Sequence, residues 1–104
     1  MVKFRFPLEM EVLKVIANYR SVKGVISLHN IVHELQRKGV LRTNFSFIKY
    51  SFGYYSKDLE EVLNNLKRLD LIKVGKSEDG FEVYEVTEKG LRILQSMVEI
   101  LGSR

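Results

Sequence analysis

Between residues 56 and 86 the hydrophobic pattern changes from a helical period to an extended one without an intervening linker. Leucine and valine first recur every three or four residues, which predicts an amphipathic helix from Lys57 to Leu69 with Ser56 as its N-cap. Two short runs rich in β-branched and aromatic residues follow, Leu71–Val74 and Phe81–Val86, around a polar loop bounded by glycines. The pattern therefore predicts a helix that leads directly into a β-hairpin.

Three further helices and one short strand complete the predicted order of elements. A first helix is expected from about Pro7 to Arg20, since proline suits the first position of a helix. A brief edge strand is predicted at Gly24–Ile26, and a second helix follows it, capped by Ser27 and ended by Gly39. The last helix is expected over about residues 87–102.

Residues 40–55 fit either kind of secondary structure. Helical spacing places Phe45, Ile48 and Phe52 on one stripe, whereas the β-branched and aromatic content favours extended structure, which we predict. Phe45, Phe47, Ile48 and Phe52 are expected in the core, because phenylalanine is usually buried. The neighbouring tyrosines are expected to keep their hydroxyls at the surface.

The composition indicates a single domain over residues 1–104, mainly α within the α+β class, because 104 residues at 45% hydrophobic content support one core. The absence of cysteine excludes disulfides and thiol catalysis. The sequence contains neither an apolar run of the roughly 20 residues that span a bilayer nor a secretion signal, so a cytoplasmic location is expected.

No enzyme signature occurs in the sequence, and neither catalysis nor a cofactor is expected. A glycine-rich phosphate loop and a nucleophile elbow are both absent. His29 and His33 are four residues apart on the second predicted helix, a spacing that can chelate a metal. Two ligands do not make a site, and we expect exposed histidines and no metal.

Positive charge is concentrated in the N-terminal half of the chain. Residues 1–55 contain nine Lys or Arg against three Asp or Glu, while residues 56–104 contain eight against ten. From Leu35 to Lys57 there are five basic residues, six aromatic residues and no acidic one. Such a segment suits a nucleic acid, because phosphates attract cations and bases stack on flat rings.

The predicted order of elements resembles that of a winged helix-turn-helix domain. The stretch from Leu63 through Val74 is similar to the winged-helix run in which the third helix turns into the first wing strand, and Val86–Gly90 is similar to the strand-to-helix cap that opens the last helix. Phe52–Leu59 resembles the Gly-Pro-Tyr-Ser-x-x-Leu signature of small prokaryotic and archaeal winged-helix proteins of the YwgA and Panacea type, with Tyr54 in place of the proline.

The resemblance implies a homodimeric transcriptional regulator that binds double-stranded DNA. The third helix would enter the major groove with Lys57, Glu61, Asn64 and Arg68 facing outward, and Asn and Arg are good readers of base edges. The remaining expected DNA contacts precede this helix or lie on the wing: Arg37, Lys38, Arg42, Lys49, Tyr54, Lys73 and Lys76.

Two alternatives remain open at this point. Asp58, Glu60 and Glu61 on the third helix, with Glu78 and Asp79 at the wing tip, disfavour phosphate and favour a winged-helix module that binds protein. RNA binding through tyrosine stacking is a third possibility.

The last helix carries two adjacent apolar stripes, more than a small monomer readily covers. We therefore predict a homodimer with these helices near the two-fold axis, against the alternative that the helix docks deeply into its own core. The expected interface residues are Ile93, Leu94, Met97, Ile100 and Leu101.

Overall fold

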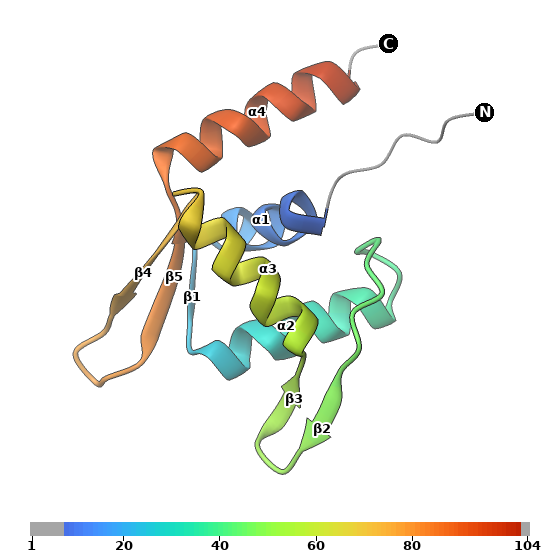
Figure 1. Ribbon diagram of the computed structural model, residues 1–104, viewed down its shortest axis with the longest axis vertical. Coiled ribbons are helices and arrows are strands. Elements are labelled where there is room, and N and C mark those ends of the chain that lie inside the picture. The colour runs from blue at the N-terminus through green and yellow to red at the C-terminus, as the bar shows by residue number, and fades with distance from the viewer. Residues whose placement is uncertain (1–7, 103–104) are drawn as a thin grey trace.

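The computed structural model describes the backbone of residues 8–102 and the side chains of residues 8–97. Within this part, four helices and five strands follow one another in the order α1, β1, α2, β2, β3, α3, β4, β5, α4 (Figure 1). The helices are α1 (Leu8–Tyr19), α2 (Val25–Arg37), α3 (Lys57–Arg68) and α4 (Glu88–Gly102). The strands are β1 (Ser21–Lys23), β2 (Ile48–Tyr50), β3 (Gly53–Tyr55), β4 (Ile72–Lys76) and β5 (Glu82–Val86).

The helix and hairpin predicted between residues 56 and 86 are confirmed. Ser56 caps α3, because its hydroxyl accepts a hydrogen bond from the backbone N–H of Leu59 at 3.2 Å. One face of α3 is buried, and its leucines and valine supply part of the core. Thr87 caps α4 in the same way, accepting from the N–H of Gly90 at 3.0 Å. The predicted start of the first helix, Pro7, lies outside the described residues.

The first strand lies three residues earlier than predicted, and the predicted strand Gly24–Ile26 is wrong. Val22 is the buried residue of β1, paired opposite Tyr84 of β5. Gly24 has a φ of 94° and turns the chain from the strand into α2. Gly24 therefore occupies the N-cap position that was predicted for Ser27, and its carbonyl accepts from the N–H of Leu28 at 3.1 Å.

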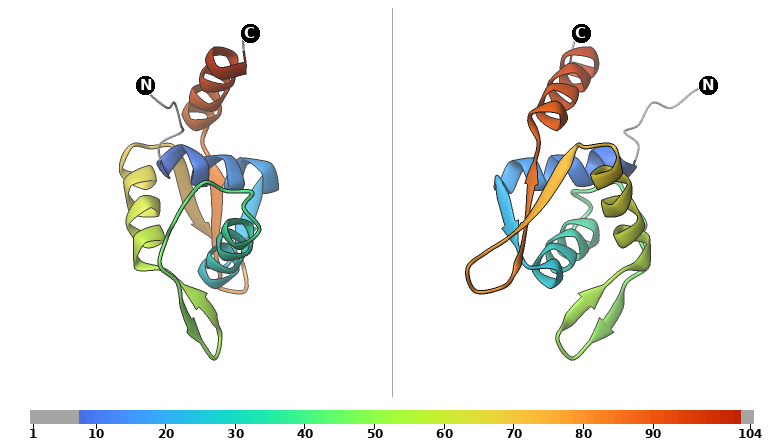
Figure 2. Two further views of the ribbon diagram at one scale, coloured as in Figure 1. Left: turned by 90° about the vertical axis from the view of Figure 1, so that its right-hand side faces the viewer. Right: turned by 60° about the vertical axis from the view of Figure 1, so that its left-hand side comes forward.

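The three-stranded sheet has the order β1–β5–β4, and both pairings are antiparallel. Tyr84 in the central strand β5 has Val22 on one side and Val74 on the other. Helix α1 packs against the sheet through β5 and against α3 and α4, while α2 contacts β1 and β3 (Figure 2). The core forms where these elements meet; its largest fully buried apolar side chains are Leu13, Ile16, Leu28, Leu59 and Leu66.

The prediction of extended structure in residues 40–55 is confirmed for β2 and β3, which form a separate antiparallel hairpin, whereas residues 42–47 have no regular structure. Phe45 is buried and Phe47 packs against the core. The expectation that Ile48 and Phe52 complete the core is wrong, since each is 58% exposed. The reason is that the hairpin projects away from the body of the domain (Figures 1 and 2).

The fold is thus α+β, with four helices and two small antiparallel sheets within residues 8–102. Two hairpins, β2–β3 before α3 and β4–β5 after it, extend from the domain on the side away from α4 (Figure 1). Helix α3 connects them. The two hairpins and α3 thus belong to one continuous stretch of chain, residues 48–86.

Candidate nucleic-acid interface

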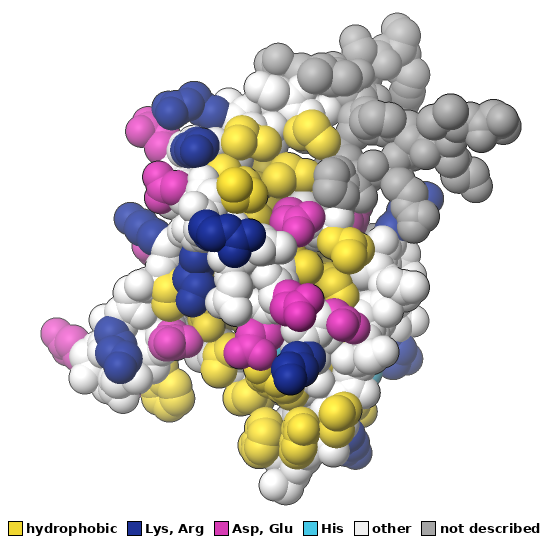
Figure 3. Space-filling view, viewed as in Figure 1, with side chains coloured by type: hydrophobic (Ala, Val, Ile, Leu, Met, Phe, Trp, Pro, Cys, Tyr) yellow, Lys and Arg dark blue, Asp and Glu magenta, His cyan; other side chains and the backbone are white. Residues whose placement is uncertain are grey.

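Helix α3 presents a polar face to solvent. Leu59, Val62, Leu63 and Leu66 are buried, which turns the opposite side of the helix outward. The four residues predicted to face outward are all exposed: Lys57, Glu61, Asn64 and Arg68. Side chains of both charges are interspersed over this helix (Figure 3).

Arg68 is held by a neighbour on its own helix. Its guanidinium donates to Oδ1 of Asn65 at 2.6 Å, and the Asn65 amide in turn donates to the carboxylate of Glu9 at 3.2 Å. Asn64 lies four residues before Arg68, but the described structure has no hydrogen bond between their side chains. Asn64 and Arg68 therefore both offer hydrogen-bonding groups to a partner of α3.

Two carboxylates in the first turn of α3 have partners in the segment that precedes the helix. Oδ2 of Asp58 accepts from the backbone N–H of Ser46 at 2.9 Å. Glu60 accepts a hydrogen bond from the hydroxyl of Tyr55, and this bond, together with burial, raises the pKa of Tyr55 to about 12. These acidic residues fasten the chain before α3, a role that their sequence position alone did not reveal.

The β2–β3 hairpin is attached to α2 by stacked aromatic rings. His33 of α2 stacks on Tyr54 with ring centroids 3.6 Å apart and planes 10° apart, and His29 stacks on Tyr55 at 4.4 Å and 12°. The side chain of Asn30 accepts from the backbone N–H of Tyr54 at 2.8 Å. Three contacts on two successive turns of α2 thus hold β3 against this helix.

Gly53 lets the hairpin approach α2 this closely. Its φ is 140°, and a Cβ at this position would lie 2.9 Å from Cγ2 of Ile26 and 2.9 Å from Nδ2 of Asn30. A side chain there would be strained in its backbone and would collide with the helix. The glycine therefore fixes both the path of the strand and its distance from α2.

His29 is fully buried, so the expectation that both histidines are exposed is wrong. Its Nδ1 accepts from the backbone N–H of Ser56 at 3.0 Å, whereas its buried Nε2 has no hydrogen-bond partner among the described residues. Burial lowers the pKa of His29 to about 4, so the ring is neutral near pH 7. His29 thus supports the residue that caps α3, and no cluster of potential metal ligands occurs in the described part of the chain.

The predicted DNA-contacting cations fall into two groups. Arg37 and Lys38 both pair with Glu34, at 2.7 Å and 3.6 Å, and the pairing with Arg37 holds the pKa of Glu34 below its usual value. Lys73 lies 3.7 Å from Glu85. The other predicted cations are exposed and make no ion pair with any described residue: Arg42, Lys49, Lys57, Arg68 and Lys76.

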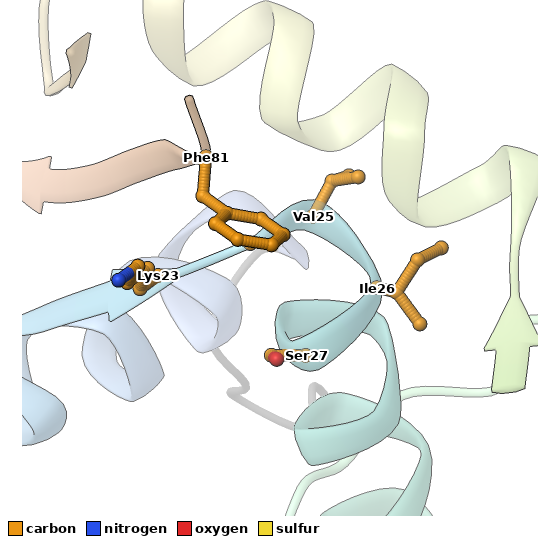
Figure 4. A pocket seen from close by; sticks show the side chains of 6 residues that line it. Lys23, Val25, Ile26, Ser27 and Phe81 are labelled. Carbon is orange, nitrogen blue, oxygen red and sulfur yellow. The ribbon is translucent and has the colours of Figure 1, made fainter. Parts of the chain in front are cut away.

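The tip of the β4–β5 hairpin is anchored to the end of β1. Lys23 of β1 forms an ion pair with Asp79 at 2.7 Å, which lowers the pKa of that carboxyl, and its ammonium lies 5.4 Å from the ring centroid of Phe81. Phe81 covers an open, mainly apolar cavity of about 310 Å³ at the first turn of α2 (Figure 4). The remaining lining residues are Gly24, Val25, Ile26 and Ser27. The cavity holds no polar side chain besides Lys23 and Ser27, and both are exposed.

The dimer-interface residues predicted on α4 lie in different surroundings. Leu94 is buried in the core of its own chain, and Ile93 and Met97 are half-buried against that core. Ile100 and Leu101 belong to the part of α4 whose side chains lie outside the described residues. Leu91, in contrast, is 46% exposed.

Comparison with known proteins gives no family assignment. No family model, curated protein or solved structure matches the chain. None of the helices described here has the length and apolar character needed to cross a membrane.

Proposed function

We propose that this chain is a winged-helix domain that binds double-stranded DNA through α3 and acts as a homodimeric transcriptional regulator. The observation that carries the proposal is the placement of α3: it leads directly into β4 of a sheet ordered β1–β5–β4, and it turns a polar face outward. In this proposal α3 enters the major groove and the β4–β5 hairpin is the wing.

The distribution of charge partners supports contact with phosphate. Lys57 and Arg68 lie at the two ends of α3 without a carboxylate partner among the described residues. Of the acidic residues that disfavour phosphate, Asp58 and Glu60 each accept a hydrogen bond from the segment before the helix, whereas Glu61 and Glu78 are exposed. At the tip of the β4–β5 hairpin, Asp79 is paired with Lys23.

A protein-interaction module with the same fold is the second candidate. The exposure of Ile48 and Phe52 on the β2–β3 hairpin favours it, because clustered exposed apolar side chains are typical of interaction sites. In that case α3 would be a solvated helix without a nucleic-acid ligand.

The two candidates are separated by binding to duplex DNA as a function of salt. Fluorescence anisotropy with random-sequence duplex and with DNA from upstream of the protein's own gene should show affinity that falls steeply between about 50 and 200 mM salt. Arg68→Ala should weaken binding roughly 5- to 150-fold, the range expected for loss of a base-reading arginine.

Arg92→Ala is the matched control, since Arg92 is an exposed arginine on α4 and its loss changes the net charge equally. It should alter affinity by no more than about twofold if the contact is local to α3. No binding of either duplex at the lowest salt would reject the DNA proposal and leave the protein-interaction module.

A further inference from the structure

The β2–β3 hairpin carries exposed apolar side chains along β2 and at its tip. Ile48 and Phe52 are each 58% exposed and Tyr50 is 43% exposed. The rings of Tyr50 and Phe52 are parallel, with centroids 5.0 Å apart and planes 5° apart. Hydrophobic side chains gather at this end of the molecule in the space-filling view (Figure 3). The tip therefore presents two stacked, exposed aromatic rings to solvent.

The fold holds this tip in a defined place. At its base, Tyr54 and Tyr55 stack on the two histidines of α2, and Gly53 allows the close approach described above. The hairpin then leads into α3 through Ser56. A rigidly mounted aromatic tip loses little conformational entropy when it binds a partner.

The charge of the hairpin's own residues favours a polyanion over an apolar partner. Lys49 lies between the exposed residues in sequence and makes no ion pair with any described residue. Because side chains alternate along a strand, Lys49 leaves the opposite face of β2 from Ile48 and Tyr50. No acidic residue occurs from Leu35 to Lys57. The cores of protein interfaces are depleted in lysine, whereas nucleic-acid surfaces combine cations with stacking rings.

We propose that the β2–β3 hairpin is a second DNA-contacting arm, which enters the minor groove beside the major groove occupied by α3. Tyr50 and Phe52 lie against sugars and base edges or wedge at a base step, as apolar side chains do in minor-groove binders. Lys49 reaches a phosphate of the adjacent backbone. A minor groove opened by such a wedge has phosphate on both walls, within reach of a lysine on the face of the strand opposite to Ile48 and Tyr50. This inference rests on the proposed function.

The double variant Tyr50→Ser/Phe52→Ser tests the arm. It should weaken binding to duplex DNA at least about tenfold and leave the salt dependence unchanged, because the lost side chains are uncharged. Lys49→Ala should instead lower the slope of log affinity against log salt by about 0.9. Tyr19→Ser is the control: Tyr19 is 50% exposed and ends α1, which lies away from the hairpin (Figure 1). It should bind DNA like the unmodified chain.

A second measurement detects contact directly and does not depend on a loss of affinity. The sequence contains no tryptophan, so Tyr50→Trp places a single indole at the tip. Its emission should be quenched when duplex DNA binds, because the ring is stacked or shielded in the groove. DNA binding with unchanged emission would overturn the proposal.

The outcomes also separate this inference from the function on which it rests. If the unmodified chain binds DNA and Arg68→Ala weakens binding while Tyr50→Ser/Phe52→Ser does not, the second arm is rejected and the proposed function stands. If the double variant changes only the self-association of the protein, the tip is a protein-docking surface and the arm is rejected. Absence of DNA binding by the unmodified chain would reject both.

Discussion

His29 joins three parts of the domain through one side chain. The ring belongs to α2, stacks on Tyr55 of β3 and accepts from the N–H of Ser56, which caps α3. The hydrogen bond from Ser56 requires the neutral ring, because a protonated Nδ1 cannot accept a hydrogen bond. The protonation state of His29 is therefore linked to the stability of the fold.

The free energy of unfolding should decrease as the pH falls from 6.5 toward 4. The pKa of His29 is about 4 in the folded chain and 6.5 in the unfolded one, so only the unfolded chain takes up this proton within that window. Between pH 7 and pH 5 the loss is about 2 kcal/mol. Urea denaturation at the two pH values measures it, and His29→Gln should remove this part of the pH dependence while His33→Gln retains it. An equal pH dependence in the unmodified chain and His29→Gln would contradict a neutral buried ring.

Sequence reasoning succeeded at single residues where the helical period alone decides exposure. Lys57, Asn64 and Arg68 face outward as expected, because the leucine stripe of α3 determines the other side. It failed for His29, since helical projection places this residue beside the polar face of α2 and contains no information on β3. The burial of His29 comes from an element 24 or more residues further along the chain.

The two hairpins differ in how far sequence could predict them. The β4–β5 hairpin follows a clear strand–loop–strand pattern and was predicted. The β2–β3 hairpin was predicted only as extended structure, because its most apolar residues, including Ile48 and Phe52, point to solvent and violate the usual relation between hydrophobicity and burial. The strand β1 was misplaced for a related reason, since a three-residue strand with one buried side chain has no detectable period.

The attachment of the β2–β3 hairpin to α2 should depend on Gly53. Gly53→Ala should reduce the free energy of unfolding by about 1–3 kcal/mol, because the residue has a positive φ and the added methyl group meets Ile26 and Asn30. Gly75→Ala in β4 is the control, since nothing lies within 4 Å of a Cβ at that position. Denaturant unfolding of both variants measures the difference. Equal stability of the two variants would show that β3 is not held closely against α2.

At the scale of the whole molecule, α4 lies at the opposite end from the two hairpins (Figures 1 and 2). It packs against α1 and β5, and Leu94 anchors it in the core. The sequence predicted the existence and start of this helix from its cap and its apolar period. It left open whether the apolar stripes pack in the core or against a partner. A helix buried within its own chain and a helix buried between two chains both require apolar side chains.

We expect a homodimer in which the exposed side of α4 meets its symmetry mate. Leu91→Glu should shift sedimentation equilibrium at micromolar concentration from dimer toward monomer, because Leu91 is 46% exposed and a carboxylate there would be buried without a partner. Ser96→Glu adds the same charge at another exposed position of α4 and is expected to leave the dimer intact. A chain that sediments only as monomer before any substitution would contradict the prediction.

The position of Ser56 has a consequence for the motions of the domain. Its backbone N–H is held by α2 and its hydroxyl begins α3, so a fluctuation that lifts β3 away from α2 also uncaps the helix. We therefore expect the hairpin and the first turn of α3 to loosen or tighten together. A partner that holds the hairpin against α2 would also favour the capped state of α3, which would couple binding at the two surfaces thermodynamically.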